Sequence, residues 1–181
     1  FFGIVPDLAV FGKALAGGYP LSAVAGLRSI MDLVETGKVL HAGTFNGNPI
    51  AMAAAKATLA VLLNPSRGIY GRLERLGLRL FEGLKQLGQK RVPILVQGVP
   101  MCFHMLFTEQ DRVRNYADFV AYDWSRSHRW VENALREGIF QMGDGRWYVS
   151  GAHTDDDISL TLQRAERALA RFAPSEEKVR A

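Results

Sequence analysis

Short apolar runs separated by turn residues open the chain. Leu8–Phe11 lies between Pro6-Asp7 and Gly12, and Ser22–Leu27 forms a second run. Runs of this length between turn residues are typical of strands, and the strand at Leu8–Phe11 is expected to be buried. Arg28–Glu35 then predicts a short helix. The opening segment is therefore expected to be strand, loop, strand and helix.

A nearly continuous apolar stretch follows a glycine-rich loop. Residues Ile50–Leu63 are rich in alanine and leucine. Asn48 can cap the first turn, and Pro49 suits the first helical position. Because this helix is apolar on almost every side, we expect it to be buried.

The remaining chain alternates helical and strand patterns. Apolar residues at spacings of three and four over Ile69–Leu87 predict a long amphipathic helix. Thr154 and Asp157 resemble a capping box, which predicts the start of a last helix. The other predicted elements are strands at Ile94–Val96, Met101–Phe107 and Trp147–Val149, and one helix over Tyr116–Arg136.

The break between these patterns predicts two parts. Asn64–Gly68 is the best candidate for a junction, which gives domains of residues 1–66 and 67–181. With 48% hydrophobic and 22% charged residues, the composition is that of a folded globular protein. The chain is thus expected to be α/β in two parts. The charged tail from Pro174 is expected to fray.

Charge, cysteine content and hydropathy narrow the class of protein. The net charge is +4, and acidic and basic residues alternate, so we expect no nucleic-acid partner. No apolar run reaches the roughly 18 residues that a membrane span needs. Cys102 is the only cysteine, and its apolar neighbours predict a buried, unreactive thiol in a cytoplasmic protein. The chain opens on Phe1 without a methionine, so we expect it to be a fragment. We expect no metal site.

Lys13 lies just after the first predicted strand, at the edge of a glycine loop. Partial desolvation there would favour the neutral amine, which attacks aldehydes to form a Schiff base. Flanking glycines would let a planar ring approach the backbone. Spacing alone nevertheless favours a solvated lysine at a turn.

The loop His41–Gly47 runs into a predicted helix start. Such a helix end offers amide donors to an anion, and Thr44 beside Gly43 adds a hydroxyl donor. Phosphate binding is one interpretation. For Asn48 the simpler role is that of the helix cap.

Together these two segments resemble class III aminotransferases, which depend on pyridoxal phosphate (PLP). The residues that match the lysine motif are Pro6, Asp7, Gly12, Lys13, Gly17, Gly18 and Pro20. Those that match the threonine loop are Gly43, Thr44, Gly47, Asn48 and Pro49. Further along, Gly98–Phe107 and Ser150–Ile158 are similar to the glutamate-1-semialdehyde 2,1-aminomutase branch.

The resemblance implies a fold-type I PLP-dependent transferase. Residues 1–66 would end the large PLP-binding domain, and residues 67–181 would form the small C-terminal α/β domain. Lys13 would bind PLP and shuttle protons, and Thr44 with Gly43 would bind its phosphate. Because Thr44 reaches the other subunit's site in this family, a homodimer is implied. The substrates would be a small-molecule amino donor and a carbonyl acceptor.

Two departures from the family pattern leave alternatives open. Gly145 stands where the aminomutase carries a glutamate, which favours a transaminase over an aminomutase. Next to it, Arg146 could bind a substrate carboxylate or simply pair with Asp144 at the surface. His153 is expected to support the last helix.

The second departure is that no pyridinium-binding aspartate or ring-stacking aromatic precedes Lys13. An incomplete enzyme is therefore expected. A non-catalytic remnant or dimerisation module remains the alternative.

Overall fold

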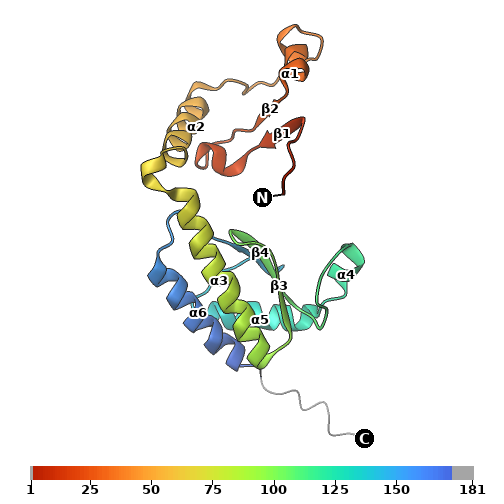
Figure 1. Cartoon of the computed structure of the whole chain (residues 1–181), viewed down its shortest axis with the longest axis vertical. Coiled ribbons are helices and arrows are strands. Elements are labelled where there is room, and N and C mark those ends of the chain that lie inside the picture. The colour runs from red at the N-terminus through yellow and green to blue at the C-terminus, as the bar shows by residue number, and fades with distance from the viewer. Residues whose placement is uncertain (1, 173–181) are drawn as a thin grey trace, which may run out of the picture. The chain divides into compact units, whose positions relative to one another are not determined.

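The chain forms two compact units. The computed structural model describes residues 2–172, without the side chains of residues 90 and 91. Unit 1 is Phe1–Gly68 and unit 2 is Ile69–Ala181 (Figure 1). The boundary falls at the end of the predicted junction, Asn64–Gly68. The tail predicted to fray lies outside the described residues.

Unit 1 begins with a two-stranded antiparallel sheet. Strand β1 (Leu8–Phe11) pairs with β2 (Ala23–Gly26), and the 3-10 helix η1 (Lys13–Ala16) follows β1. Both strands were expected from the sequence, but the expected burial of β1 is wrong. Val10 is 75% exposed, because two strands alone provide little surface to cover it.

Three further helical segments complete unit 1: α1 (Arg28–Glu35), α2 (Pro49–Leu62) and η2 (Pro65–Arg67). Asn48 caps α2 as predicted, and its side chain accepts hydrogen bonds from the backbone N–H groups of Ile50 and Ala51.

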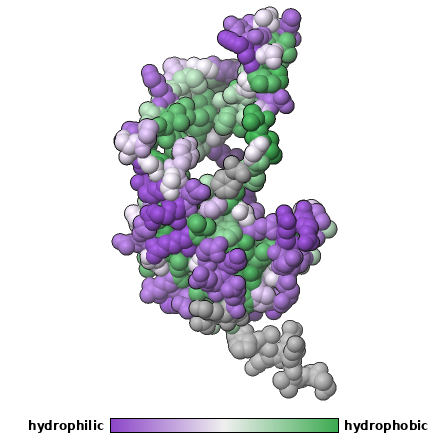
Figure 2. Space-filling view, viewed as in Figure 1, coloured by the Kyte–Doolittle hydropathy of each residue, from purple (hydrophilic) through white to green (hydrophobic). Residues whose placement is uncertain are grey.

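The expected burial of α2 on all sides is also wrong, because only Ala51 and Ala55 are buried. Helix α2 packs mainly against η1, which covers one of its faces. Figure 2 shows the resulting hydrophobic surface over unit 1. No helix in residues 2–172 is both long and apolar enough to cross a membrane.

Unit 2 is a three-stranded antiparallel sheet packed with helices. Its strands β3 (Ile94–Val99), β4 (Cys102–Phe107) and β5 (Arg146–Tyr148) lie in the order β3-β4-β5. Helix α3 (Ile69–Arg91) contacts α6 (Asp155–Ala170) and β3. The core between them includes Leu76, Leu84, Phe103, Met105, Phe107, Trp130 and Leu169.

The helix predicted over Tyr116–Arg136 is broken. The structure has α4 (Tyr116–Val120) and α5 (Trp124–Arg136) instead. Asp123 lies between them, where its side chain accepts a hydrogen bond from the backbone N–H of Arg126 and caps α5. Its own N–H donates to the carbonyl of Phe107, which ties the break to the end of β4.

Cys102 is exposed, contrary to the prediction. Side chains of a strand alternate between two faces, and in β4 Phe103 and Met105 face the core. Cys102 therefore points to the other face. Its apolar neighbours in the sequence belong to the opposite side of the same strand.

Candidate functional site

Lys13 has the most unusual backbone conformation in the described chain. Its φ angle is +50°, and it is the only non-glycine residue with a positive φ among residues 2–172. Gly12 before it is extended, and Lys13 begins η1. For an L-residue this left-handed region brings the side chain close to the backbone. A strained residue at this point in the fold is the kind of outlier that marks functional sites.

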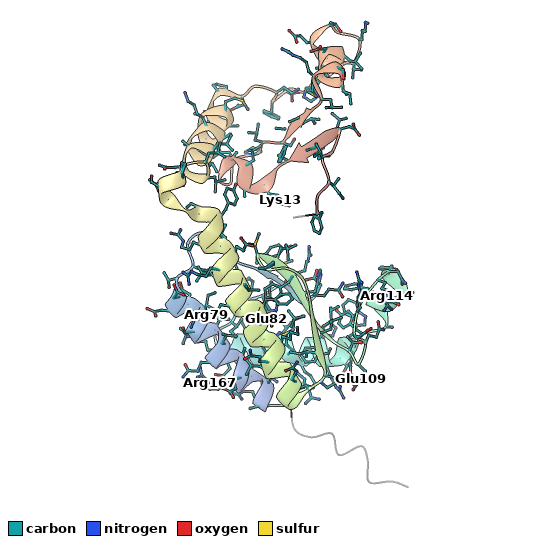
Figure 3. All side chains as sticks on the ribbon, in the orientation of Figure 1. Lys13, Arg79, Glu82, Glu109, Arg114 and Arg167 are labelled. Carbon is teal, nitrogen blue, oxygen red and sulfur yellow. The ribbon has the colours of Figure 1, made fainter. Side chains whose placement is uncertain are left out.

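The side chain of Lys13 is exposed, so the expected partial desolvation is not found in this chain. The β1–β2 sheet has only two strands, and unit 1 offers little that could cover the amine. Figure 3 labels Lys13 at the η1 turn. The backbone is nevertheless well fixed, because η1 packs on α2. The apolar pattern of α2 does not predict this contact from sequence.

The loop that carries Gly43 and Thr44 forms a compact turn. The N–H of Asn46 donates to the carbonyl of Gly43 at 3.0 Å, and its side-chain amide donates to the carbonyl of His41. Gly47 has a φ of +69°. These bonds hold the turn just before α2, with Thr44 exposed at its start.

Free donors in this loop suit an anion. Within the described residues, the backbone N–H groups of Thr44, Phe45 and Gly47 take part in no hydrogen bond. The first donors of α2 are already used, because Asn48 accepts from them. An anion would therefore bind to the loop amides and the Thr44 hydroxyl and not to the first N–H groups of α2.

Arg146 is held in unit 2 by Asp144. Its Nε donates to Asp144 Oδ2 at 2.6 Å, and Nη1 donates to the hydroxyl of Tyr148 at 3.3 Å. The hydrogen bond and the charge of Asp144 raise the pKa of Arg146 above its ordinary value. This is the geometry of the surface pair considered from sequence, although the guanidinium edge away from Nε is not bonded to Asp144.

The ring of His153 supports the start of α6. Its Nδ1 accepts a hydrogen bond from the backbone N–H of Ser150 at 2.9 Å, which places the ring proton on Nε2 in the neutral form. The capping box of Thr154 and Asp157 follows directly. Both features agree with the structural role expected for His153.

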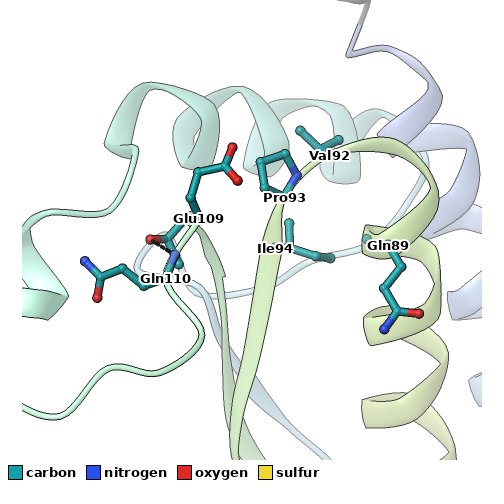
Figure 4. Close-up of a pocket in the computed structure, with 8 residues that line it drawn as sticks. Gln89, Val92, Pro93, Ile94, Glu109 and Gln110 are labelled. Atoms are coloured by element: carbon teal, nitrogen blue, oxygen red, sulfur yellow. Dashed lines mark hydrogen bonds between the residues drawn. The ribbon is translucent and has the colours of Figure 1, made fainter.

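The predicted site residues are divided between the units. Lys13, Gly43 and Thr44 belong to unit 1, and Arg146 belongs to unit 2. No hydrogen bond in the described chain joins Lys13 to Thr44. A pocket of about 460 Å³ in unit 2 contains none of them (Figure 4). Its lining includes Gln89, Val92, Pro93, Ile94, Glu109 and Gln110.

The residues present fit part of a PLP site. They supply an exposed amine on a strained turn and a loop with free anion donors. PLP needs both, because it carries an aldehyde and a phosphate.

Comparison with known proteins agrees with this chemistry. The family model for class III aminotransferases matches residues 1–169. Among solved structures, the chain is similar to a β-phenylalanine aminotransferase from Variovorax paradoxus, with 29% identity and a TM-score of 0.78. An omega-transaminase from Sphaerobacter thermophilus has 27% identity and a TM-score of 0.77. The FumI protein of Sphingopyxis sp. MTA144, solved in its PLP internal aldimine form, has 26% identity and a TM-score of 0.77.

These matches cover 93% of this chain but only 37–39% of the three longer proteins. The chain thus spans well under half the length of its structural relatives. The predicted fold class, the α/β fold of fold-type I PLP enzymes, is confirmed. The chain belongs to the class III aminotransferase family, a family of enzymes that use pyridoxal phosphate.

Proposed function

We propose that this chain is part of a PLP-dependent aminotransferase and that Lys13 is its cofactor lysine. The observation that carries the proposal is the left-handed backbone of Lys13 at the end of β1. Such strain persists only when the surrounding fold imposes it, and it gathers at functional sites. The complete enzyme would transfer an amino group from a small amino donor to a carbonyl acceptor.

Lys13 would act as the proton carrier of the reaction. PLP, when bound, supplies an electron sink for negative charge at the substrate carbon. The Nζ of Lys13 would take the proton from the substrate α-carbon and return it later in the half-reaction. This requires an amine that can reach the substrate from a fixed backbone, and the exposed side chain of Lys13 and the packing of η1 on α2 support this role.

Thr44 and Gly43 would bind the cofactor phosphate. The free N–H groups of Thr44, Phe45 and Gly47 support this role, and the threonine hydroxyl adds a further donor. By the resemblance to the family, this loop would serve the site of a second subunit. We therefore propose a homodimer with shared sites, located in a reducing cytoplasm.

Arg146 would bind a substrate carboxylate through its Nη1–Nη2 edge, since Nε is held by Asp144. In the complete enzyme, Arg146→Lys should lower kcat/KM for amino-acid donors more than for simple amines. An equal loss for both donors would leave Arg146 only its structural pair with Asp144.

The backbone conformation of Gly145 supports a transaminase over an aminomutase. Gly145, at the position of the aminomutase glutamate, has a φ of +85°. A Cβ there would lie 2.6 Å from the carbonyl oxygen of Met105, so any larger residue would shift the chain. A glutamate has no room in this conformation.

The test is to incubate the 181-residue chain with PLP, reduce it with borohydride and map the labelled peptides. We expect the label on Lys13 and its loss in Lys13→Ala. Lys38 and Lys56, which lie in the same unit, serve as internal controls for ordinary lysines. Label spread evenly over these lysines, in a monomeric chain, would support a non-catalytic remnant instead.

A further inference from the structure

The turn that carries Lys13 rests on one face of α2. In the described part of unit 1, the only buried residues are Ala16 of η1 and Ala51 and Ala55 of α2. Ala16 has no exposed surface at all. Helix α2 and η1 pack against each other. The best-buried contact of unit 1 is therefore the one beneath the candidate cofactor lysine.

Gly17 shows how close this contact is. It ends η1 in a left-handed conformation, with a φ of +58°. A Cβ at Gly17 would lie 3.2 Å from the Oγ1 of Thr58, whereas a Cβ at Gly18 would meet nothing within 4 Å. Ala51, Ala55 and Thr58 follow at spacings of four and three, which places them on one face of α2.

The turn also has its own hydrogen bonds. The N–H groups of Leu15, Gly17 and Tyr19 donate to carbonyls three residues earlier, at 3.1, 3.3 and 3.1 Å. Lys13 lies three residues before Ala16 in the same short helix, so a turn fixed at Ala16 and Gly17 restricts how far the backbone of Lys13 can relax.

We propose that Ala55 and Thr58 are positioning residues, which hold Lys13 in its left-handed conformation through η1. The inference rests on the proposed role of Lys13 and adds the support that makes this role possible. Small side chains are required along this face, because a larger one would push η1 off the helix.

The test compares Ala55→Leu with Ala57→Leu in the full chain. Both change the same residue type on the same helix, but Ala57 is exposed. The first readout is amide hydrogen exchange of Leu15, Gly17 and Tyr19, which needs no cofactor. Overpacking a tight contact should speed this exchange by about fivefold or more in Ala55→Leu. Ala57→Leu should leave it unchanged.

The second readout is the share of borohydride-fixed PLP found on Lys13. We expect this share to fall by about fivefold or more in Ala55→Leu. It should stay at the wild-type level in Ala57→Leu and in Ala55→Ser, which keeps the side chain small. Equal behaviour of the two leucine variants in both readouts would overturn the proposal.

A second pair of variants covers the case in which Ala55→Leu unfolds unit 1. Gly17→Ala places a methyl group against Thr58 Oγ1, and Thr58→Ala removes that oxygen. The double variant should therefore recover part of the labelling and exchange protection that Gly17→Ala loses. No recovery would contradict the close contact between Gly17 and Thr58 on which the proposal rests. If wild-type Lys13 were not labelled selectively, the proposed function would fail, while hydrogen exchange would still decide the role of α2.

Discussion

At the scale of single residues, the proposed cofactor lysine, Lys13, is also the residue with a strained backbone. Other positive φ angles among residues 2–172 fall on glycines, which adopt them without a steric penalty. A lysine at such a position costs stability, of the order of 1–2 kcal/mol for an L-residue. Its presence there supports the proposed role of the Lys13 amine.

Substitutions at Lys13 can separate the effect of its backbone strain on stability from the effect of its amine on PLP labelling. Lys13→Gly should be more stable than Lys13→Ala by about 0.5–1 kcal/mol, because glycine escapes the left-handed penalty but loses chain entropy. Both variants should lose the PLP label. Lys56, exposed in α2, is the control: there the glycine variant should be less stable than the alanine variant by about 1 kcal/mol. Chemical denaturation of all four variants measures the differences, and the same sign at both positions would refute strain at Lys13.

The sequence motif predicts Lys13 as the cofactor lysine, but it does not predict the backbone conformation of this residue. The residue types around it match a family motif, and motifs record which residues are present. A φ angle depends on how η1 packs on α2, which lies more than thirty residues away in the sequence. Cys102 shows the same limit, because its neighbours along the chain are not its neighbours in the sheet.

At the scale of elements, local signals predicted the helix starts and missed the helix break. The caps at Asn48 and Thr154 were predictable, because their hydrogen bonds join residues two or three positions apart. The break before α5 depends on Asp123, whose N–H bonds to the distant Phe107. A helical period continues across this point in sequence, although the backbone of Asp123 bonds to Phe107 at the end of β4.

Gly145 lies where the loop before β5 runs beside β4. Its carbonyl accepts a hydrogen bond from the N–H of Met105 at 2.9 Å, and a Cβ would clash with the carbonyl of the same residue. Gly145→Ala should therefore destabilise unit 2 by at least about 2 kcal/mol. The control is Gly143→Ala, since a Cβ at Gly143 meets nothing within 4 Å and its φ is not positive. Thermal unfolding of both variants tests this, and equal midpoints would contradict it.

Glu137 joins the end of α5 to α6. Its carboxylate bonds to Arg167 at 2.8 Å and to Arg171 at 2.6 Å, and these hydrogen bonds lower the pKa of Glu137 below its ordinary 4.5. A carboxyl group whose pKa is lower in the folded state stabilises the fold above its unfolded pKa. That contribution is lost as the pH falls through the folded pKa.

On acidification below pH 4.5, the ordinary pKa of this carboxyl group, Glu137→Gln should therefore lose less of its free energy of unfolding than the wild-type chain. The dependence should not disappear, because Arg75 also lowers the pKa of Asp155. Glu132→Gln, at an exposed position on the same helix, is the control. Urea denaturation as a function of pH gives the comparison, and parallel curves for wild type and Glu137→Gln would refute the role of this cluster.

At the scale of the whole molecule, the two units differ in the size of their hydrophobic cores. Unit 2 has a continuous cluster of aromatic and aliphatic side chains between its sheet and helices. Unit 1 buries only three alanines within its described residues. Its exposed apolar side chains include Val10, Leu40, Phe45 and Ile50. Apolar side chains exposed in this number on one unit are typical of a surface that another part of a protein covers.

The difference in core predicts that the units fold unequally when separated. Residues 69–181 should unfold cooperatively alone, and residues 1–68 should not, because a two-stranded sheet with three buried alanines cannot offset the entropy of ordering. Within unit 2, Leu84→Ala should cost about 2–5 kcal/mol, since Leu84 has no exposed surface. Leu78→Ala, on the same helix but 48% exposed, should cost much less. Circular dichroism melts of both pieces provide the measurement. A cooperative transition in residues 1–68 alone would mean that this unit holds the Lys13 turn without unit 2.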